Sequence, residues 1–121
     1  MNAVFVFVGG GIGSLVRYGI SFLIGTFTAS NFPIATLISN LVASIILALI
    51  TVQMSTKMEE YSWVHPLVLI GFCGGFSTFS TFSIETVGLI HSGHYVYAML
   101  NLVVSVAVGI GLVYYILHSS R

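Results

Sequence analysis

Charged residues are scarce in this sequence. Its 121 residues include three Lys or Arg and three Asp or Glu, a charged fraction of 5%, whereas 57% of the residues are hydrophobic. A soluble domain carries roughly 25% charged residues, because its surface must stay hydrated. The composition therefore excludes a soluble globular domain and indicates a membrane protein.

The sequence also lacks the residue sets that catalysis and metal binding need. Its single cysteine, Cys73, excludes an internal disulfide, and we expect it to be a small packing residue. No Ser/His/Asp set or pair of carboxylates lies within the apolar runs, so no enzyme is predicted. The four histidines have neither i, i+4 spacing nor carboxylate neighbours, so interfacial positions rather than metal sites are expected for His65, His91, His94 and His118.

Four apolar runs are each long enough to cross a bilayer, which takes about 20 helical residues. They predict an all-α membrane protein with one four-helix transmembrane domain over residues 1–121. The first run has no basic segment before it and contains Arg17, so we expect a mature helix and not a signal peptide. The expected helices span residues 3–25, 33–53, 64–91 and 94–118.

The glycines of the first run do not form a dinucleotide-binding fingerprint, because no strand precedes them and position 14 is serine. Gly9 and Gly13 instead make a small-xxx-small pair, which lets two helices approach closely in a membrane. The spacing therefore predicts a packing role for this face of the first helix.

An even number of helices places both termini on one side of the membrane. Lys57 and Arg121 would share that side, nominally the cytoplasmic one, but two charges give a weak orientation signal. We therefore expect insertion in both orientations. No internal repeat is visible, and four helices are too few for the paired inverted halves of many transporters, so a transport pathway would need more than one copy.

Arg17 and Glu85 are the only charged residues well inside the expected helices. Unpaired charges at membrane depth are costly, so we expect these two to pair directly or through water. With Asn40, both fall on the side of the midplane away from the termini. The pair is either purely structural or a source of positive potential for an anion vestibule, and the sequence leaves both readings open.

Polar and small residues recur every four positions in the second and fourth runs, which places them on one face of each helix. Such faces either join helices to one another or line a pathway, and the spacing alone does not choose between these roles. The two faces consist of Thr36, Asn40 and Ser44 in the second helix and of Asn101, Ser105 and Gly109 in the fourth.

The third run contains an unusual segment, GFCGGFSTFSTFS, from Gly71 to Ser83. Its paired glycines followed by hydroxyl residues predict a helix break near Gly74–Thr78. Membranes tolerate such a break only where the backbone is buried in protein or lines a cavity. The freed carbonyls can hold a cation, or the hydroxyls of Ser77 and Thr78 can satisfy the backbone without an ion.

Three segments together resemble one known family, and the third of them is the most specific. They are Gly10-x-x-Gly13-x-x-x-Arg17-Tyr18, Pro33-x-x-Thr36-Leu37-x-x-Asn40 and Gly71-x-Cys73-Gly74-Gly75-Phe76-Ser77-Thr78-Phe79-Ser80-Thr81-Phe82-Ser83-x-Glu85. In these motifs, and over its whole length, the chain resembles the Fluc fluoride channels, also called the CrcB family.

The resemblance implies a passive, fluoride-selective channel that exports fluoride and crosses the plasma or inner membrane several times. It implies an antiparallel, dual-topology homodimer with two pores at its interface. It also implies a structural Na⁺ at the interface, held by the backbone carbonyls of Gly74 and Ser77. The implied pore residues are Phe79 and Phe82, whose positive ring edges would face fluoride, the Asn40 amide donor, the Ser105 hydroxyl and Thr81.

Two positions depart from the family pattern. Ala43 stands where many relatives have glycine, and Asn101 stands where some have a tyrosine that contributes to the pore. The second departure leaves the role of position 101 open.

Two other functions remain as alternatives. Small multidrug-type transporters also have four short helices, but they resemble one another in an acidic residue of the first helix, where this chain has Arg17 and no acid. A structural subunit of a larger membrane complex is the other alternative.

Overall fold

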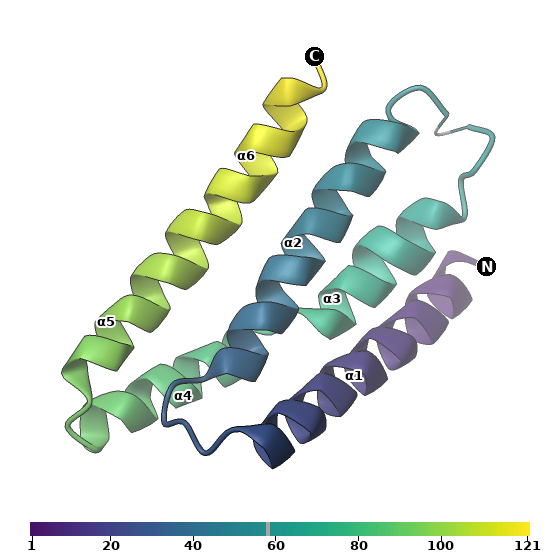
Figure 1. Cartoon of the computed structure of the whole chain (residues 1–121). Coiled ribbons are helices and arrows are strands. Elements are labelled where there is room, and N and C mark those ends of the chain that lie inside the picture. Colours follow the sequence, from purple (N-terminus) through teal and green to yellow (C-terminus); the bar gives the residue numbers. More distant parts are fainter. Residues whose placement is uncertain (58) are drawn as a thin grey trace.

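The computed structural model describes residues 1–57 and 59–121 of the chain, and within them every regular element is a helix. Four helical spans are long and apolar enough to cross a membrane (Figure 1). The predicted four-span, all-helical membrane architecture is therefore confirmed. The spans are α1 (Asn2–Phe27), α2 (Ile34–Met54), a third span over His65–His91 and a fourth over Tyr95–Ser119.

The third and fourth spans are each built from several segments. The third consists of η1 (His65–Phe72), α3 (Cys73–Phe76) and α4 (Phe79–His91). The fourth consists of α5 (Tyr95–Val103), η2 (Val104–Val108) and α6 (Gly109–Ser119). η1 and η2 are wider, π-type turns, which often occur at functional sites.

Two extended residues separate α3 from α4. Ser77 has φ −81° and ψ 156°, and Thr78 has φ −151° and ψ 120°. The Ser77 N–H still donates to the Cys73 carbonyl at 2.9 Å and so completes α3, whereas Thr78 lies outside both helical ladders and its backbone groups need other partners.

Both chain ends lie at the end of the bundle that also carries the connection between α2 and η1, whereas the other two connections lie at the opposite end (Figure 1). The connection between α4 and α5 turns at Gly93, whose φ of +81° is readily adopted only by glycine. This arrangement is the one that an even number of spans predicts.

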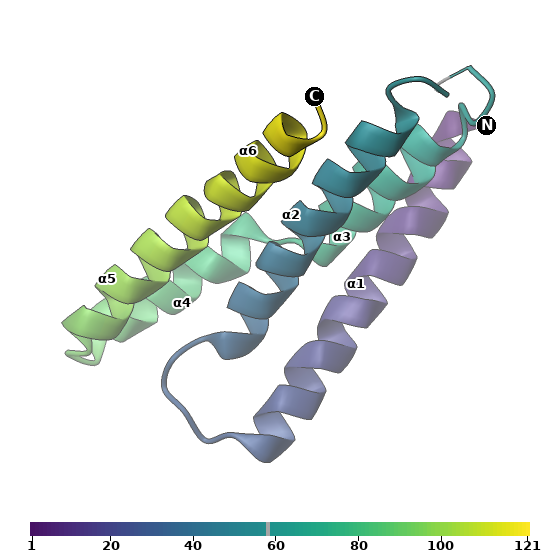
Figure 2. The ribbon, with the colours of Figure 1, turned by 45° about the horizontal axis from the view of Figure 1, so that its top comes forward.

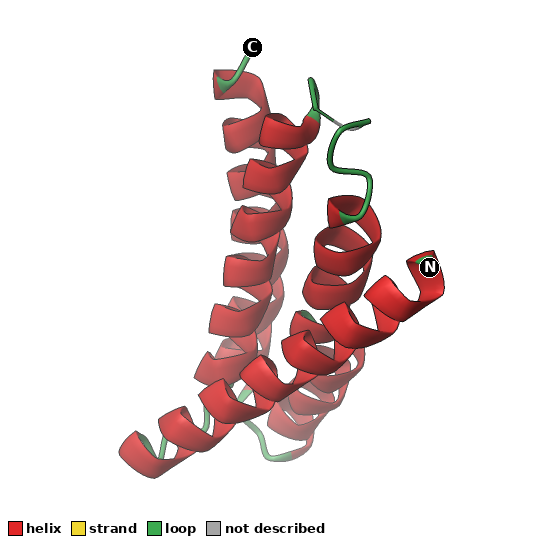
Figure 3. Ribbon diagram, turned by 90° about the vertical axis from the view of Figure 1, so that its right-hand side faces the viewer, coloured by secondary structure: helices red, strands yellow, loops and turns green. Residues whose placement is uncertain are grey.

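α1 crosses the third span obliquely, and glycines from both helices form the contact (Figure 3). A Cβ atom on Gly9 would overlap the backbone of Leu67, and one on Gly13 would overlap the backbone of Phe72. From the other side, Gly75 meets the backbone of Gly10 in the same way. The close helix packing predicted from the spacing of Gly9 and Gly13 is present, because both helices lack side chains at the crossing.

The third span changes neighbours along its length (Figure 2). Its first half, η1 and α3, packs on α1, whereas α4 packs on α5. α2 lies between these groups and contacts α1, α3, α4 and α6. The interruption at Ser77 and Thr78 therefore lies beside α2, where the span passes from one neighbour to the other.

Candidate functional site

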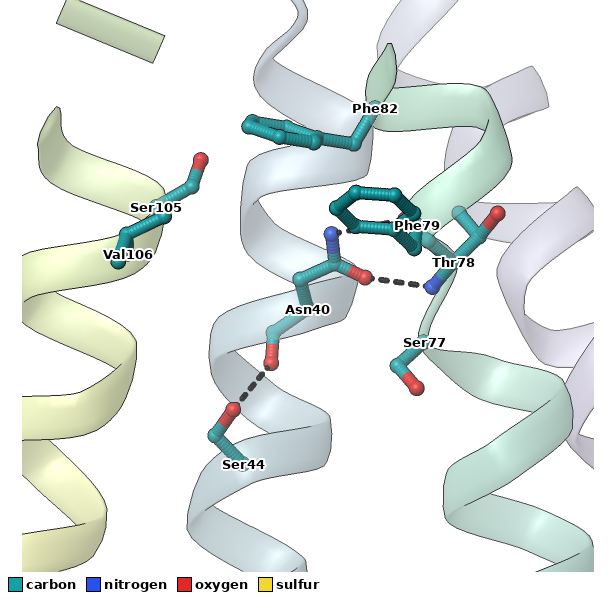
Figure 4. A pocket seen from close by; sticks show the side chains of 8 residues that line it. All are labelled: Asn40, Ser44, Ser77, Thr78, Phe79, Phe82, Ser105 and Val106. Carbon is teal, nitrogen blue, oxygen red and sulfur yellow. Dashed lines mark hydrogen bonds between the residues drawn. The ribbon is translucent and has the colours of Figure 1, made fainter. Parts of the chain in front are cut away.

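A cleft of about 270 Å³ opens beside the interruption of the third span (Figure 4). It lies between α2, the α3–α4 junction and η2, so it joins three of the four spans. Uncharged polar groups and two aromatic rings dominate its lining. The lining residues are Asn40, Ser44, Ser77, Thr78, Phe79, Phe82, Ser105 and Val106.

Asn40 supplies the partners that the extended backbone at Thr78 lacks. Its Oδ1 accepts a hydrogen bond from the Thr78 backbone N–H at 2.7 Å, and its Nδ2 donates to the Thr78 carbonyl at 3.2 Å (Figure 4). The side-chain amide thus replaces both helical partners of one residue. Nδ2 carries two hydrogens, so its second N–H is left for the cleft.

Thr78 also caps the N-terminus of α4. Its Oγ1 accepts from the Thr81 backbone N–H at 3.2 Å, which is an N-cap bond that satisfies one free donor of the first helical turn. The Thr81 hydroxyl is 3.2 Å from the same Oγ1. Thr81, predicted as a pore residue, therefore contacts the cap and does not line this cleft.

The two candidate ring residues lie together but differ in burial. The ring centroids of Phe79 and Phe82 are 6.0 Å apart, with the planes tilted by 39°. Phe79 is 80% exposed on the single chain, whereas Phe82 is 7% exposed. Phe76, at the same three-residue spacing, belongs to α3 and is 2% exposed in the core. The interruption thus separates a core ring from the two rings at the cleft.

Ser105 forms the opposite wall of the cleft, on η2 (Figure 4). Its hydroxyl donates to Oδ1 of Asn101 at 3.3 Å. Asn101 is fully buried, and its Nδ2 donates to Oγ1 of Thr86 at 2.9 Å. Two residues of the predicted polar face of the fourth span, Asn101 and Ser105, are therefore hydrogen-bonded to each other, and Asn101 is also bonded to α4.

Arg17 and Glu85, which were predicted to pair directly or through water, are not bonded directly to each other. Nε of Arg17 donates to the Gly75 carbonyl at 3.2 Å, and Oε1 of Glu85 accepts from the Thr36 hydroxyl at 2.8 Å. The two groups lie on different helix crossings, because α1 packs on α3 whereas Glu85 lies on α4, which faces α2 at this point. Arg17 satisfies a carbonyl at the C-terminal end of α3, where helical donors are absent.

The carbonyls of Gly74 and Ser77 fit the requirements of a cation site. Both have lost their usual helical donors, because Thr78 N–H bonds to Asn40 and Thr81 N–H bonds to the Thr78 hydroxyl. The two residues line one groove of about 190 Å³. A Cβ on Gly74 would meet no atom within 4 Å, so this face of the chain is open. Hard carbonyl oxygens suit a hard cation such as Na⁺.

Sequence reasoning missed part of the cleft. Ser44 appeared only as a member of the polar face of α2, and Ser77 only at the predicted helix break, as a carbonyl ligand of a cation or as a hydroxyl that satisfies the backbone, yet both line the cleft. Thr78 belonged to the predicted helix break, whereas Val106 carried no signal for this role. The four-residue spacing of Asn40 and Ser44 was the available clue, since side chains so spaced share one helical face.

The chain is similar to known proteins over nearly its full length. The model of the family described as CrcB-like protein, Camphor Resistance (CrcB), matches residues 4–116. The fluoride-specific ion channel FluC of Coxiella burnetii (strain CbuK_Q154) is 42% identical over 108 residues, which cover 88% of this chain and 87% of that protein. The FluC protein of Pyrococcus abyssi is 42% identical over 107 residues, covering 88% and 85% of the two chains. That of Ruminiclostridium cellulolyticum is 40% identical over 107 residues, covering 88% and 82%. On these matches, the chain belongs to the CrcB family.

Proposed function

We propose that this protein is a fluoride-selective ion channel through which fluoride leaves the cell down its gradient. The similar proteins are named fluoride-specific ion channels, which are not enzymes, and they match this chain over most of its length. The four apolar spans supply the membrane context that a channel needs. We place the protein in the plasma or inner membrane.

The observation that carries the proposal is the chemistry of the cleft. Fluoride is a small, strongly hydrated anion, so a pathway must replace its water with hydrogen-bond donors and positive edges. The cleft offers an amide N–H from Asn40 and hydroxyls such as that of Ser105. The edges of the Phe79 and Phe82 rings carry partial positive charge. None of the described residues that line the cleft is a carboxylate, so an anion there meets no like charge from them.

We propose that the working unit is an antiparallel homodimer with two pores. One chain presents an open cleft whose ring, Phe79, is 80% exposed, and a second copy in the opposite orientation can cover it. Two oppositely oriented chains also provide the inverted repeat that four spans cannot contain. In this arrangement the interruption between α3 and α4 acts as a break in the third transmembrane helix.

We propose in addition that the Gly74 and Ser77 carbonyls of both copies hold a structural Na⁺ on the dimer axis. A two-fold axis turns two free carbonyls into four oxygen ligands. Replacing sodium by a large organic cation during purification should lower dimer stability and flux. Unchanged stability and flux would contradict the ion and leave the channel proposal intact.

Reconstitution into liposomes tests the main proposal. We expect fluoride efflux, followed with a fluoride electrode, in vesicles that contain this protein alone, and little chloride efflux in a parallel assay. The fluoride flux should persist when the proton gradient is collapsed at constant fluoride driving force. Flux that stops under these conditions would indicate a coupled transporter, and no flux at all would favour a structural subunit.

A further inference from the structure

Asn101 lies outside the cleft lining but is connected to it by hydrogen bonds. It is 0% exposed and lies on α5, four residues before Ser105. The Thr86 hydroxyl donates to the Phe82 carbonyl at 2.8 Å, Asn101 Nδ2 donates to Thr86 Oγ1 at 2.9 Å, and the Ser105 hydroxyl donates to Asn101 Oδ1 at 3.3 Å. One chain of side-chain bonds therefore runs from the backbone beneath a cleft ring to a hydroxyl on the opposite wall.

The chemistry of these groups fixes the direction of every bond. The Thr86 hydroxyl has one hydrogen, which the Phe82 carbonyl takes, so Oγ1 can only accept from Asn101. This contact requires the NH₂ end of the Asn101 amide to face Thr86. Its oxygen then faces Ser105, and an amide oxygen can receive only the Ser105 hydrogen.

The bonds also differ in strength along the chain. The two inner distances, 2.8 and 2.9 Å, are typical of well-formed hydrogen bonds. The outer distance, 3.3 Å, exceeds the usual limit of about 3.0 Å for O–H···O bonds. The Asn101 amide is therefore held firmly, whereas the Ser105 hydroxyl at the cleft is held loosely.

We propose that Asn101 is a positioning residue that holds the Ser105 hydroxyl hydrogen when the cleft is empty and competes with the permeating anion for it. The inference rests on the proposed function, and its ligand is a small anion that accepts hydrogen bonds. When the anion arrives, Ser105 gives up its long bond to Asn101 and donates to the anion. When the anion leaves, the hydroxyl returns to Asn101, so release is faster than from a hydroxyl with no competing acceptor.

The test compares Asn101→Leu in two backgrounds, with fluoride efflux from liposomes measured at a series of fluoride concentrations. Leucine removes the competing acceptor. In the otherwise wild-type protein we expect the half-saturating fluoride concentration to fall about 3- to 10-fold, which corresponds to one hydrogen bond. The maximal rate should fall as well, because the anion is released more slowly. In a Ser105→Ala background, Asn101→Leu should leave the half-saturating concentration unchanged.

Thr86→Val is a second variant, because it alters Asn101 indirectly and valine matches threonine in shape. The Asn101 amide loses the partner that orients it, so we expect the half-saturating fluoride concentration to fall about 2- to 3-fold. The matched control is Thr51→Val, since Thr51 makes the same bond to a carbonyl four residues back, to Leu47 at 2.7 Å, on an exposed face outside the cleft. Thr51→Val should leave the half-saturating concentration at the wild-type value.

The outcomes separate this inference from the proposed function. If Asn101 were purely structural, Asn101→Leu would lower thermal stability and leave the half-saturating fluoride concentration unchanged. Alternatively, Asn101→Leu would change that concentration equally with and without the Ser105 hydroxyl. Either result, with wild-type fluoride flux intact, overturns the inference alone. Wild-type protein that passes no fluoride overturns the proposed function and the inference with it.

Discussion

The two halves of the third span pack in opposite ways. In η1 and α3 the contact with α1 is made by backbone, because Gly71 and Gly75 meet Gly9 and Gly10 with no side chains between them. In α4 the contacts with α2 and the fourth span include side-chain bonds, between the Glu85 carboxylate and Thr36 and between the Thr86 hydroxyl and Asn101. The third span thus packs on α1 through its backbone in its first half and presents polar and aromatic side chains in its second half.

The two extended residues between these halves explain how one span holds both. Ser77 and Thr78 interrupt the helix, and Asn40 from α2 satisfies the Thr78 backbone on both sides. Without that interruption, Phe76, Phe79 and Phe82 would follow one slowly drifting stripe. With it, one ring stays in the core and two lie at the cleft. The comparison predicts that substitutions in the first half abolish folding, whereas substitutions in the second half alter flux.

The largest effect is expected for Gly13→Val. The new side chain would overlap the backbone of Phe72, and backbone on both sides of the crossing cannot move aside without separating the helices. We expect little or no monodisperse protein by size-exclusion chromatography in detergent. The control is Gly11→Val, two residues away on the same helix, where a Cβ meets nothing within 4 Å. Equal yields of the two variants would show that the glycine crossing does not hold the fold.

Asn40→Asp should have the next largest effect, this time on flux. Aspartate loses the N–H that bonds to the Thr78 carbonyl and adds a negative charge at the cleft wall. We expect fluoride efflux to fall about 30- to 100-fold, equivalent to roughly 2–3 kcal/mol, while the protein remains folded. Asn2→Asp, at the exposed start of α1, makes the same chemical change outside the cleft and should keep wild-type flux.

Phe79→Ile and Phe82→Ile should each lower flux about 3- to 10-fold, because isoleucine has no positive ring edge to offer an anion. The two should differ in stability. Phe82 is 7% exposed within its own chain, so its replacement should lower the thermal midpoint more than replacement of Phe79, which is 80% exposed in the single chain and is covered only by the proposed second copy. The control is Phe22→Ile on the exposed face of α1. Wild-type flux in both cleft variants would remove the rings from the pathway.

The features that the sequence predicted are those encoded locally. Each span is one long apolar run, and length and hydropathy alone identify it. The packing of Gly9 and Gly13 follows from their four-residue spacing on one helix. Their partners, Gly71 and Gly75, could not be predicted, because the sequence of one chain does not show which helices cross or in which register.

The absence of a direct bond between Arg17 and Glu85 likewise depends on how the helices are arranged, which the sequence of one chain does not give. Matching two charges by depth ignores the direction in which each side chain leaves its helix, and direction decides the partner. Arg17 faces the end of α3 and finds a carbonyl, whereas Glu85 faces α2 and finds Thr36. The position of Thr81 depends likewise on the N-cap geometry at Thr78, which forms only once the helix is interrupted.

The smallest effect on flux is expected for Thr36→Val, which tests whether side-chain bonds in the second half also hold the fold. Thr36 is 5% exposed and donates to Oε1 of Glu85, whose Oε2 has no hydrogen-bond partner among the described residues. Valine keeps the shape and removes this donor, so stability should fall by roughly 1 kcal/mol, seen as a lower thermal midpoint in detergent. Flux should stay within about twofold of wild type, because Thr36 does not line the cleft. A tenfold loss of flux at unchanged stability would instead place the Thr36–Glu85 pair in the ion pathway and extend the functional half of the third span beyond the two rings.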